Sequence, residues 1–521
     1  MHISQCRPCL LVALLIAAGC GGENTAPERR TLVDSRDRYD PRTLDPARAV
    51  DVPSGRAVGY VFDGLTRFAP DGSLQPGLAE RWDVSSDGRE YVFHLRRGVR
   101  FHDGRPFTAR SVVRSYERVL DPSAGGARGW PLYPISGARD FAAGRVRRIG
   151  GLEAVDDSTI RIRLDTAFAI FPKLLAMPIT MIVPDSVGAD FSERPIGTGP
   201  WRFVEWRHDD YLLFARNQEY FGGAPKEDSL RARIIAEPST AVAEYETGNV
   251  DLLDIPEAET AQWRNTDGRK ERLQSVPGLR LWYVVINTKR GPLSDVRVRQ
   301  AINHAVDVQA MLQTLLGGRG RRAAGVIPPT LPGADTSRAP YAHDVARARQ
   351  LLTEAGHPNG IDVELWHSQE PTFVRAAQTI QAYLGEAGIR ARLVQRDANA
   401  ARAAAFKGEL DLYLKDWFAD YPDAENFLYP LLHSDNVGVG GNTSFYTNPR
   451  YDSLVTASRR ELDDARRIAL YRQADSTAFA DAPMVFLVFY EELFAVQPWL
   501  RDFKVPVIFN GQRWTDASIA R

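Results

Sequence analysis

The stretch FHLRRGVRFHDG, residues 93–104, alternates apolar and polar side chains up to a turn at Gly98. Tyr91 extends this alternation upstream, which predicts a half-buried strand. Thr108 then suits the cap of a helix that continues through Tyr116. A strand, a turn and a helix in such close succession indicate mixed α/β structure around this stretch.

Strand and helix patterns alternate in an irregular order along the rest of the chain. The apolar spacing predicts a hairpin over 201–206 and 211–215, two strands around a turn at 156–157, one long amphipathic helix over 296–315, a βαβ unit over 361–365, 373–384 and 389–394, and a buried strand over 484–490. Because βαβ units pair their strands in parallel, we expect a parallel sheet in the C-terminal half. These patterns together favour α/β domains over a helix bundle or a β-sandwich.

The length and composition fit a globular protein with two or three hydrophobic cores. The chain has 521 residues, of which 44% are hydrophobic and 25% charged. Its formal net charge of -1 provides no basic field that would attract nucleic acid. Beyond the N-terminus, no segment approaches the roughly 18 consecutive apolar residues of a membrane span.

The N-terminus has the pattern of an export signal. Arg7 precedes an apolar run over 10–18, which is shorter than the roughly 20 residues needed to span a membrane. Small residues directly before Cys20 resemble a bacterial lipobox, so we expect a signal peptide over 1–19 and lipid attachment at Cys20. The polar segment 20–30 would then be a flexible tether. A signal peptide with a coincidental cysteine, or an uncleaved anchor, remains an alternative.

All three cysteines lie in the first twenty residues, at Cys6, Cys9 and Cys20. The rest of the chain therefore forms no disulfide, and its stability has to come from a large core. The nine histidines are scattered without zinc-site spacing, so we predict no metal and no cofactor.

The chain carries no recognisable catalytic motif. It has no GxSxG elbow, no HExxH and no P-loop, and we predict that it is not an enzyme. Residues 318–323 loosely fit a dinucleotide fingerprint, but they follow a predicted helix instead of opening one. We interpret them as a solvated loop.

Several short motifs, in order along nearly the whole chain, carry a family resemblance. They are TLDP at 43–46, FDGLT at 62–66, PGLAERW at 76–82, the stretch 93–104, GTGP at 197–200, DVRVRQA at 295–301 and DWFADY at 416–421. In these motifs Gly98, Gly104 and Gly199 fit turns with unusual backbone angles, while Trp82, Phe93 and Phe101 fit core packing. The set resembles the family 5 extracellular solute-binding proteins of ABC transporters, which bind oligopeptides, dipeptides or nickel.

The resemblance implies an α/β periplasmic-binding-protein fold with two lobes, three domains and a closing hinge. Domain I would be discontinuous, over 31–65, 186–285 and 491–521; domain II would cover 66–185 and domain III 286–490. It also implies a monomer in the periplasm or cell envelope, held at the membrane by lipidated Cys20, that delivers a solute to an ABC permease.

The ADY sequence ending at Tyr421 suggests the ligand site. In the oligopeptide binders that it resembles, the matching aspartate pairs with the α-ammonium of the ligand, which points to Asp420. A buried ammonium needs such a partner, because an unpaired charge in a closed cleft is very costly. Trp417 and Tyr421 would flank the ligand, and Tyr490 matches a cleft-lining tyrosine. A surface aspartate and simple aromatic packing are the alternatives.

The chain also departs from the oligopeptide pattern. Leu414 stands where that pattern has an arginine for the ligand carboxylate, and Ala398 where it has a cleft tryptophan. Lys415 carries a positive charge, but on a strand it points away from Leu414. Short peptides are the expected ligand; a metal chelate, an opine or an oligosaccharide, or a sensor or enzyme built on the same lobes, stays open.

Overall fold

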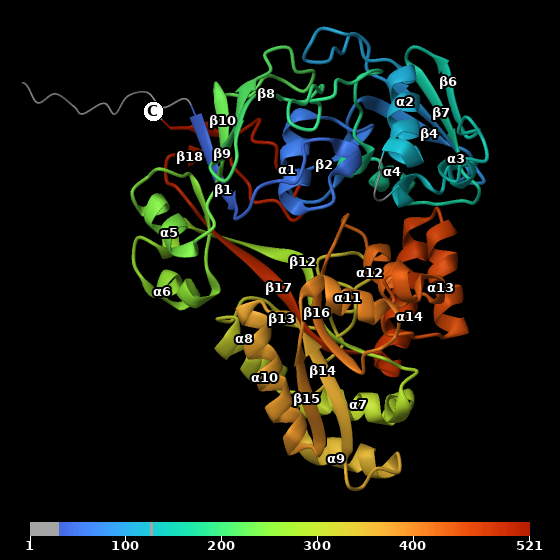
Figure 1. The fold of residues 1–521 in the computed structure, drawn as a ribbon, viewed down its shortest axis with the longest axis vertical. Helices are drawn as coiled ribbons and strands as arrows, with labels where there is room; N and C mark the ends of the chain where they lie inside the picture. Colours follow the sequence, from blue (N-terminus) through green and yellow to red (C-terminus); the bar gives the residue numbers. More distant parts are fainter. Residues whose placement is uncertain (1–30, 125–128, 521) are drawn as a thin grey trace, which may run out of the picture.

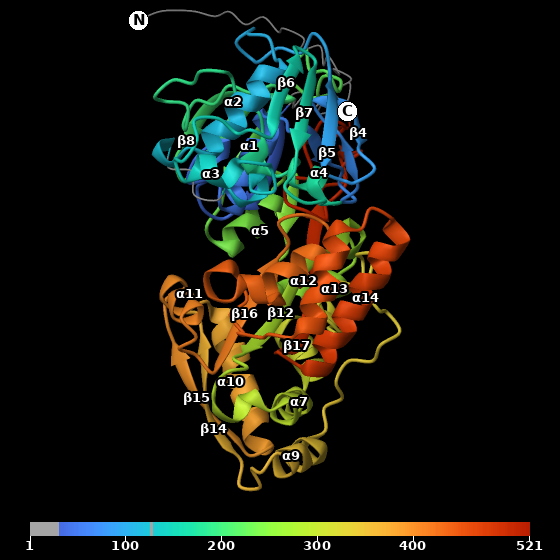
Figure 2. The same cartoon turned by 90° about the vertical axis from the view of Figure 1, so that its right-hand side faces the viewer.

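The computed structural model describes residues 31–124 and 129–520. The predicted signal peptide, the lipidation site Cys20 and the tether lie outside the described residues. The described chain forms two lobes, one above the other in Figures 1 and 2, with strands running between them.

The upper lobe contains two four-stranded sheets and two small two-stranded ones. Its first sheet has the order β1-β10-β9-β8, with β1 (Thr31–Asp37), β10 (Ser229–Ile234), β9 (Tyr211–Arg216) and β8 (Trp201–Arg207). Its second is antiparallel, in the order β4-β5-β7-β6, with β4 (Ala79–Val84), β5 (Glu90–Leu95), β7 (Thr159–Arg163) and β6 (Leu152–Asp156). The small pairs are β2 (Thr66–Phe68) with β3 (Leu74–Pro76), and β18 (Leu500–Arg501) with β19 (Ser518–Ile519).

A seven-stranded sheet lies in the lower lobe and extends to the upper lobe. Its order is β11-β17-β12-β16-β14-β15, with β13 also paired to β17. The strands are β11 (Leu252–Asp254), β17 (Met484–Val496), β12 (Leu273–Ile286), β16 (Leu412–Phe418), β14 (Ile361–His367), β15 (Ile389–Gln395) and β13 (Arg321–Arg322). The predicted hairpin, the strands around 156–157, the late buried strand and the parallel βαβ unit are confirmed.

Two long strands, β12 and β17, cross from one lobe to the other (Figure 1). Near the upper lobe β17 pairs with β11, and near the lower lobe β12 pairs with β16. The pairing between β12 and β17 shifts register between Pro277 and Leu281. An irregular ladder bends more easily than a continuous one, so this point suits a hinge.

Fourteen α-helices cover the sheets of the described chain. They are α1 (Val52–Val61), α2 (Ala109–Leu120), α3 (Ala138–Ala142), α4 (Phe171–Leu174), α5 (Pro238–Glu246), α6 (Thr260–Asn265), α7 (Val296–Ala305), α8 (Val308–Leu315), α9 (Val345–Glu354), α10 (Pro371–Glu386), α11 (Ala398–Phe406), α12 (Glu425–Leu432), α13 (Pro449–Arg460) and α14 (Asp464–Asp481). Helices α1 to α4 belong to the upper lobe and α7 to α14 to the lower one, while α5 and α6 flank the upper end of β17 (Figure 1).

Two sequence predictions about residues 296–323 are wrong. The single long helix is two helices, because Val306 is extended and Asp307 caps α8 by accepting a hydrogen bond from Ala310 N. The loop over 318–323 is not solvated throughout: Arg319 is 1% exposed and donates to the carbonyl of Ile255 at 2.6 Å. The buried arginine ties this segment to the upper end of the sheet.

Most of the motif residues have the structural roles that the sequence analysis expected. Phe93 and Phe101 are buried in the core, and Gly98 has φ of 77°, as a tight turn requires. Gly199 differs from the prediction, because its φ is ordinary. A Cβ at that position would lie 2.5 Å from the carbonyl carbon of Val61, so glycine is needed there for close packing.

Candidate functional site

A cavity of about 170 Å³ lies where the two lobes meet. The upper lobe lines it with the start of α1, Trp130 and residues 177–179, and the lower lobe lines it with residues 418–420. Phe509 completes the wall, with its ring centre 6.4 Å from that of Phe418. A ligand in this cavity would therefore contact both lobes at once.

Asp420 contributes to the lower wall of the cavity. It follows the end of β16 and is partly buried. Its backbone N–H donates to Asn426 Oδ1, at 2.8 Å, at the start of α12. This bond fixes the short turn between β16 and α12, and with it the position of the carboxylate at the cavity.

The strand before Asp420 is β16, which continues to Phe418. Trp417 is therefore part of the strand and lies opposite Leu281 of β12. It packs against the core and does not line the cavity.

Tyr421 supports the cavity wall from behind. It is 2% exposed, and its hydroxyl donates to Glu425, which also pairs with Arg459 at 2.9 Å. Its ring centre lies 6.2 Å from that of Trp130, which does line the cavity. Tyr421 thus acts through Trp130 and does not itself face the space.

Tyr490 lies on β17, away from the cavity wall formed by Asp420. It is stacked on Trp282, with 6.1 Å between ring centres, and its hydroxyl donates to Glu257 Oε1 at 2.8 Å. The guanidinium groups of Arg280 and Arg319 lie 5.2 and 4.9 Å from its ring centre. Of the four predicted residues, Asp420 lines the cavity, and Trp417 and Tyr421 lie next to it without lining it. Tyr490 does not line the cavity; it is stacked on Trp282 of β12.

The charges around Tyr490 form a group that the sequence analysis missed. We call it the hinge cluster; it consists of Asp254, Glu257, Arg280, Arg319 and Glu492. Burial, followed by the neighbouring Asp254, raises the pKa of Glu492 to about 7. Burial also raises the pKa of Asp254, although Arg319 lowers it in part. No local pattern marks these residues, because they come from four separate parts of the chain: β11 with the short 3-10 helix Glu257–Glu259 that follows it, β12, the loop after α8, and β17.

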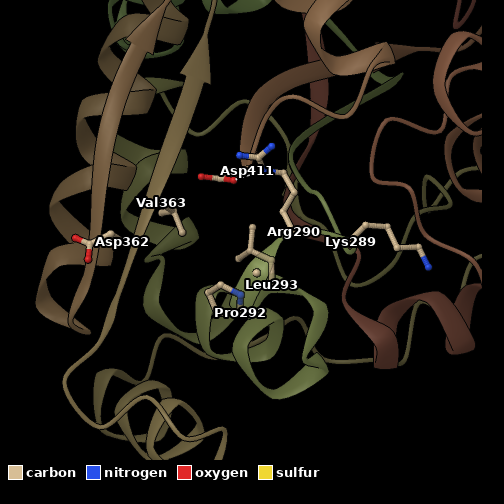
Figure 3. Close-up of a pocket in the computed structure, with 8 residues that line it drawn as sticks. Lys289, Arg290, Pro292, Leu293, Asp362, Val363 and Asp411 are labelled. Carbon is tan, nitrogen blue, oxygen red and sulfur yellow. Dashed lines mark hydrogen bonds and ion pairs between the residues drawn. The ribbon is translucent and has the colours of Figure 1, made fainter.

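A second, more open pocket lies in the lower lobe, away from the interlobe cavity. Its volume is about 390 Å³, and residues 289–293, Asp362, Val363 and Asp411 line it. In Figure 3 Arg290 and Asp411 point toward each other, and their ion pair measures 2.6 Å. Lys289 points away from the pocket in the same view. Since only one lobe forms this pocket, it is not a place where a ligand would join the two.

Two further properties concern the whole of the described chain. Residues 31–124 and 129–520 contain no group of three or more His, Cys, Asp or Glu side chains arranged to hold a metal ion. No helix in the same ranges is long and apolar enough to cross a membrane.

Comparison with known proteins identifies the family. The family model described as "Bacterial extracellular solute-binding proteins, family 5 Middle" matches residues 73–439. The chain belongs to this family. It is accordingly an extracytoplasmic solute-binding protein with a two-lobed α/β fold, as the sequence motifs predicted.

Individual relatives cover nearly the whole chain. Heme-binding protein A of Haemophilus influenzae is 30% identical over 91% of this chain and 92% of its own length. Glutathione-binding protein GsiB of Salmonella choleraesuis is 31% identical over 86% of each chain. The solved structure of the ABC transporter-associated periplasmic binding protein DppA from Helicobacter pylori, in complex with the peptide STSA, is 28% identical. It covers 94% of this chain and 98% of its own, with a TM-score of 0.78. All three are named as binding proteins.

Proposed function

We propose that this chain is the solute-binding component of an ABC importer, and that it binds short peptides in the interlobe cavity and delivers them to the permease. The observation that carries the proposal is Asp420, which lines a cavity shared by both lobes. The peptide-bound DppA relative supports the ligand class. The proposal includes no catalytic step.

The charge of the cavity wall favours a cationic group. Its lining residues include two carboxylates, Asp51 and Asp420, and no lysine or arginine. Asp51 is already used as the cap of α1, where it accepts from Ser54 N at 2.9 Å and from Ser54 Oγ at 2.8 Å. Asp420 is the one of the two that the family motif points to for the α-ammonium of a peptide, whose burial requires an anionic partner.

Closure would follow from contact with both lobes. A ligand shifts an open–closed equilibrium only by its difference in affinity for the two states. A peptide between Trp130 and Phe418 gains its full set of contacts only when the lobes meet. The bend would occur near Pro277 to Leu281, and we keep the three-domain division over 31–65, 186–285 and 491–521, over 66–185, and over 286–490.

Anchoring of the protein to a membrane is part of the same proposal. Lipid on Cys20 would hold the protein beside the permease on the outer face of a membrane, and the chain would act as a monomer. Replacing Cys20 by Ala should release the protein from the membrane fraction of the expressing cells. Unchanged membrane association of the Ala variant would contradict anchoring through this residue.

Calorimetry tests the ligand class directly. We expect a library of di- to pentapeptides to include binders, and Asp420→Asn to weaken them at least tenfold. The same peptides with an acetylated N-terminus should lose affinity for the wild type and show no further loss with the variant. Asp267→Asn, at a side chain 90% exposed, is the control. Equal affinity of wild type and Asp420→Asn for free peptides would refute the ammonium contact, and no binding of any peptide would refute the ligand class.

A further inference from the structure

The wall of the interlobe cavity is almost entirely apolar. Apart from Asp51 and Asp420, the described residues that line it are Ala49, Val50, Val52, Gly55, Trp130, Met177, Pro178, Ile179, Phe418, Ala419 and Phe509. Within the described chain, no serine, threonine, asparagine, glutamine or histidine side chain contributes to this wall. A neutral polar group that entered the cavity would therefore lose its hydrogen bonds to water and find few side chains to replace them.

Three aromatic side chains of the wall are only half-buried. Trp130, Phe418 and Phe509 pack against the main hydrophobic core but keep intermediate exposure. Met177 and Ile179, in contrast, are 7% and 4% exposed. Removing apolar surface from water is favourable, so half-buried aromatic rings favour an apolar group as their neighbour. Phe418 belongs to the lower lobe and the other two rings to the upper one, so a single apolar group would cover surface of both lobes.

The size of the cavity fits one side chain. Its volume is about 170 Å³, whereas sites that enclose a whole small-molecule ligand measure roughly 300–1,000 Å³. An apolar cavity of about 150 Å³ stays dry and binds a molecule the size of benzene. The side chains of leucine and phenylalanine are comparable in size to benzene. The cavity therefore encloses one apolar side chain, and the rest of a peptide would lie outside it.

The position of Asp420 indicates which residue of a peptide enters the cavity. Asp420 directly follows Phe418 and Ala419, and all three line the cavity. In the first residue of a peptide, the α-ammonium and the side chain are bonded to the same Cα atom, so the two groups lie close together. With the ammonium at Asp420, the first side chain of the peptide is the one that reaches the apolar wall.

We propose that the interlobe cavity selects peptides whose first residue has an apolar side chain of about the size of leucine or phenylalanine. The proposal rests on the proposed function and names the class of peptide that the site prefers. Such a side chain contacts Phe418 and Phe509 together only when the lobes meet, so it also favours the closed form. A peptide that begins with glycine leaves the aromatic rings uncovered and gains less from closure.

The test measures by calorimetry the affinities of tripeptides that differ only in the first residue. Leu-Ala-Ala and Phe-Ala-Ala should bind about ten- to a hundredfold more tightly than Gly-Ala-Ala, the range expected for burying one such side chain. Val-Ala-Ala should bind about tenfold more tightly than Thr-Ala-Ala, which has the same shape with one hydroxyl in place of a methyl group. Equal affinity for the valine and threonine peptides would overturn the proposal.

Two variants should move the size preference in opposite directions. Gly55→Ala places a Cβ 2.6 Å from Phe509 Cε2, so it narrows the cavity and should weaken Leu-Ala-Ala about tenfold and Gly-Ala-Ala far less. Phe509→Leu removes the ring, so it widens the cavity and should shift the preference toward Trp-Ala-Ala. Gly59→Ala and Phe141→Leu, at a half-buried phenylalanine of α3, are the controls. An unchanged size preference in both cavity variants would contradict the assignment of the cavity to the first side chain.

A simple amine separates this proposal from the proposed function. 3-Methylbutylamine has an ammonium group and the branched apolar end of leucine, but no peptide bond. At equal ionic strength it should raise the thermal midpoint of the wild type more than methylamine does, and Gly55→Ala should remove the difference. If no peptide binds but this difference is present, the peptide function fails and the apolar selection stands. If peptides bind equally whatever their first side chain, the peptide function stands and the apolar selection is wrong. Equal effects of the two amines on the wild type would also count against the apolar selection.

Discussion

Lys173 in the upper lobe donates to Asp423 in the lower lobe at 2.6 Å, and its Nζ also donates to the carbonyl of Pro422 at 3.0 Å. Asp423 is buried, and Tyr471 donates to its other oxygen at 2.8 Å. Burial alone would raise the pKa of Asp423, but the charge and hydrogen bond of Lys173 keep it below its usual value. This ion pair joins the two lobes close to the turn that carries Asp420. Closure of the lobes therefore affects the wall of the interlobe cavity.

Replacing Lys173 by Met should open the lobes. The variant leaves a buried carboxylate with one partner fewer, at a cost of about 1–3 kcal/mol that the open form avoids. We expect small-angle scattering to show a larger radius of gyration than for the wild type without ligand, and we expect peptide affinity to fall several-fold. Lys226→Met, which removes an exposed pair with Asp502 within the upper lobe, is the control. A radius that does not change would show that Lys173 has no role in closure.

The hinge cluster should make stability depend on pH. The pKa of Glu492 is raised from 4.5 to about 7, so the folded protein holds a proton there that the unfolded chain has already lost. Stability therefore falls as pH rises from about 4.5 to 7 and stays lower above that range. Glu492→Gln, which is always neutral, should raise the thermal midpoint at pH 8 and change it little at pH 4.5.

The adjacent residue provides the control for this prediction. Glu491 lies on the other face of β17 and is 3.8 Å from Arg264. Glu491→Gln should not reproduce the gain at pH 8. A gain for Glu492→Gln of equal size at both pH values would mean that packing, and not ionisation, is responsible.

Much of the fold could be predicted because its signals are local. The alternation around Phe93 and the run over 484–490 each define a strand from neighbouring residues alone, and both strands are present. The helix over 296–315 was predicted wrongly, because its apolar spacing continues across the break and the capping role of Asp307 is visible only in the structure. Periodicity shows which face is buried, but it does not show where the helix ends.

The site could be predicted only in part, for a physical reason. Asp420 was predicted from its motif, and the structure does place it at an interlobe cavity. The upper-lobe wall, Trp130 and Gly55 for example, was not predicted, because it is assembled from segments far from Asp420 in sequence. The hinge cluster was missed for the same reason. Contacts between distant segments depend on the packing of whole lobes and leave no mark in a local pattern.

Arg513 should stabilise the upper lobe. It is buried, pairs with Asp63, and donates to the carbonyls of Gly59 and Phe62 at 2.8 Å each. Removing one partner of a buried pair costs about 3–5 kcal/mol. We expect Arg513→Met to lower the thermal midpoint by several degrees, whereas the exposed Arg501→Met should not. Equal midpoints for the two variants would show that the Asp63 pair contributes nothing net.

Gly55 should set the size of the interlobe cavity. It lines the cavity with Pro178 and Phe509, and a Cβ on Gly55 would lie 2.6 Å from Phe509 Cε2. Gly55→Ala should therefore displace the Phe509 ring and weaken peptide binding about tenfold, as measured by calorimetry.

The control for this change is one helical turn away. A Cβ on Gly59 would meet only Asn510 Cβ, at an ordinary 3.7 Å. Gly59→Ala should keep full affinity and add up to about 1 kcal/mol of helix stability. Both Gly→Ala substitutions gain the same helix propensity. A difference in peptide affinity between the two variants therefore comes from the change in the cavity alone. If the two variants bind peptides equally well, the ligand does not occupy the space between Gly55 and Phe509.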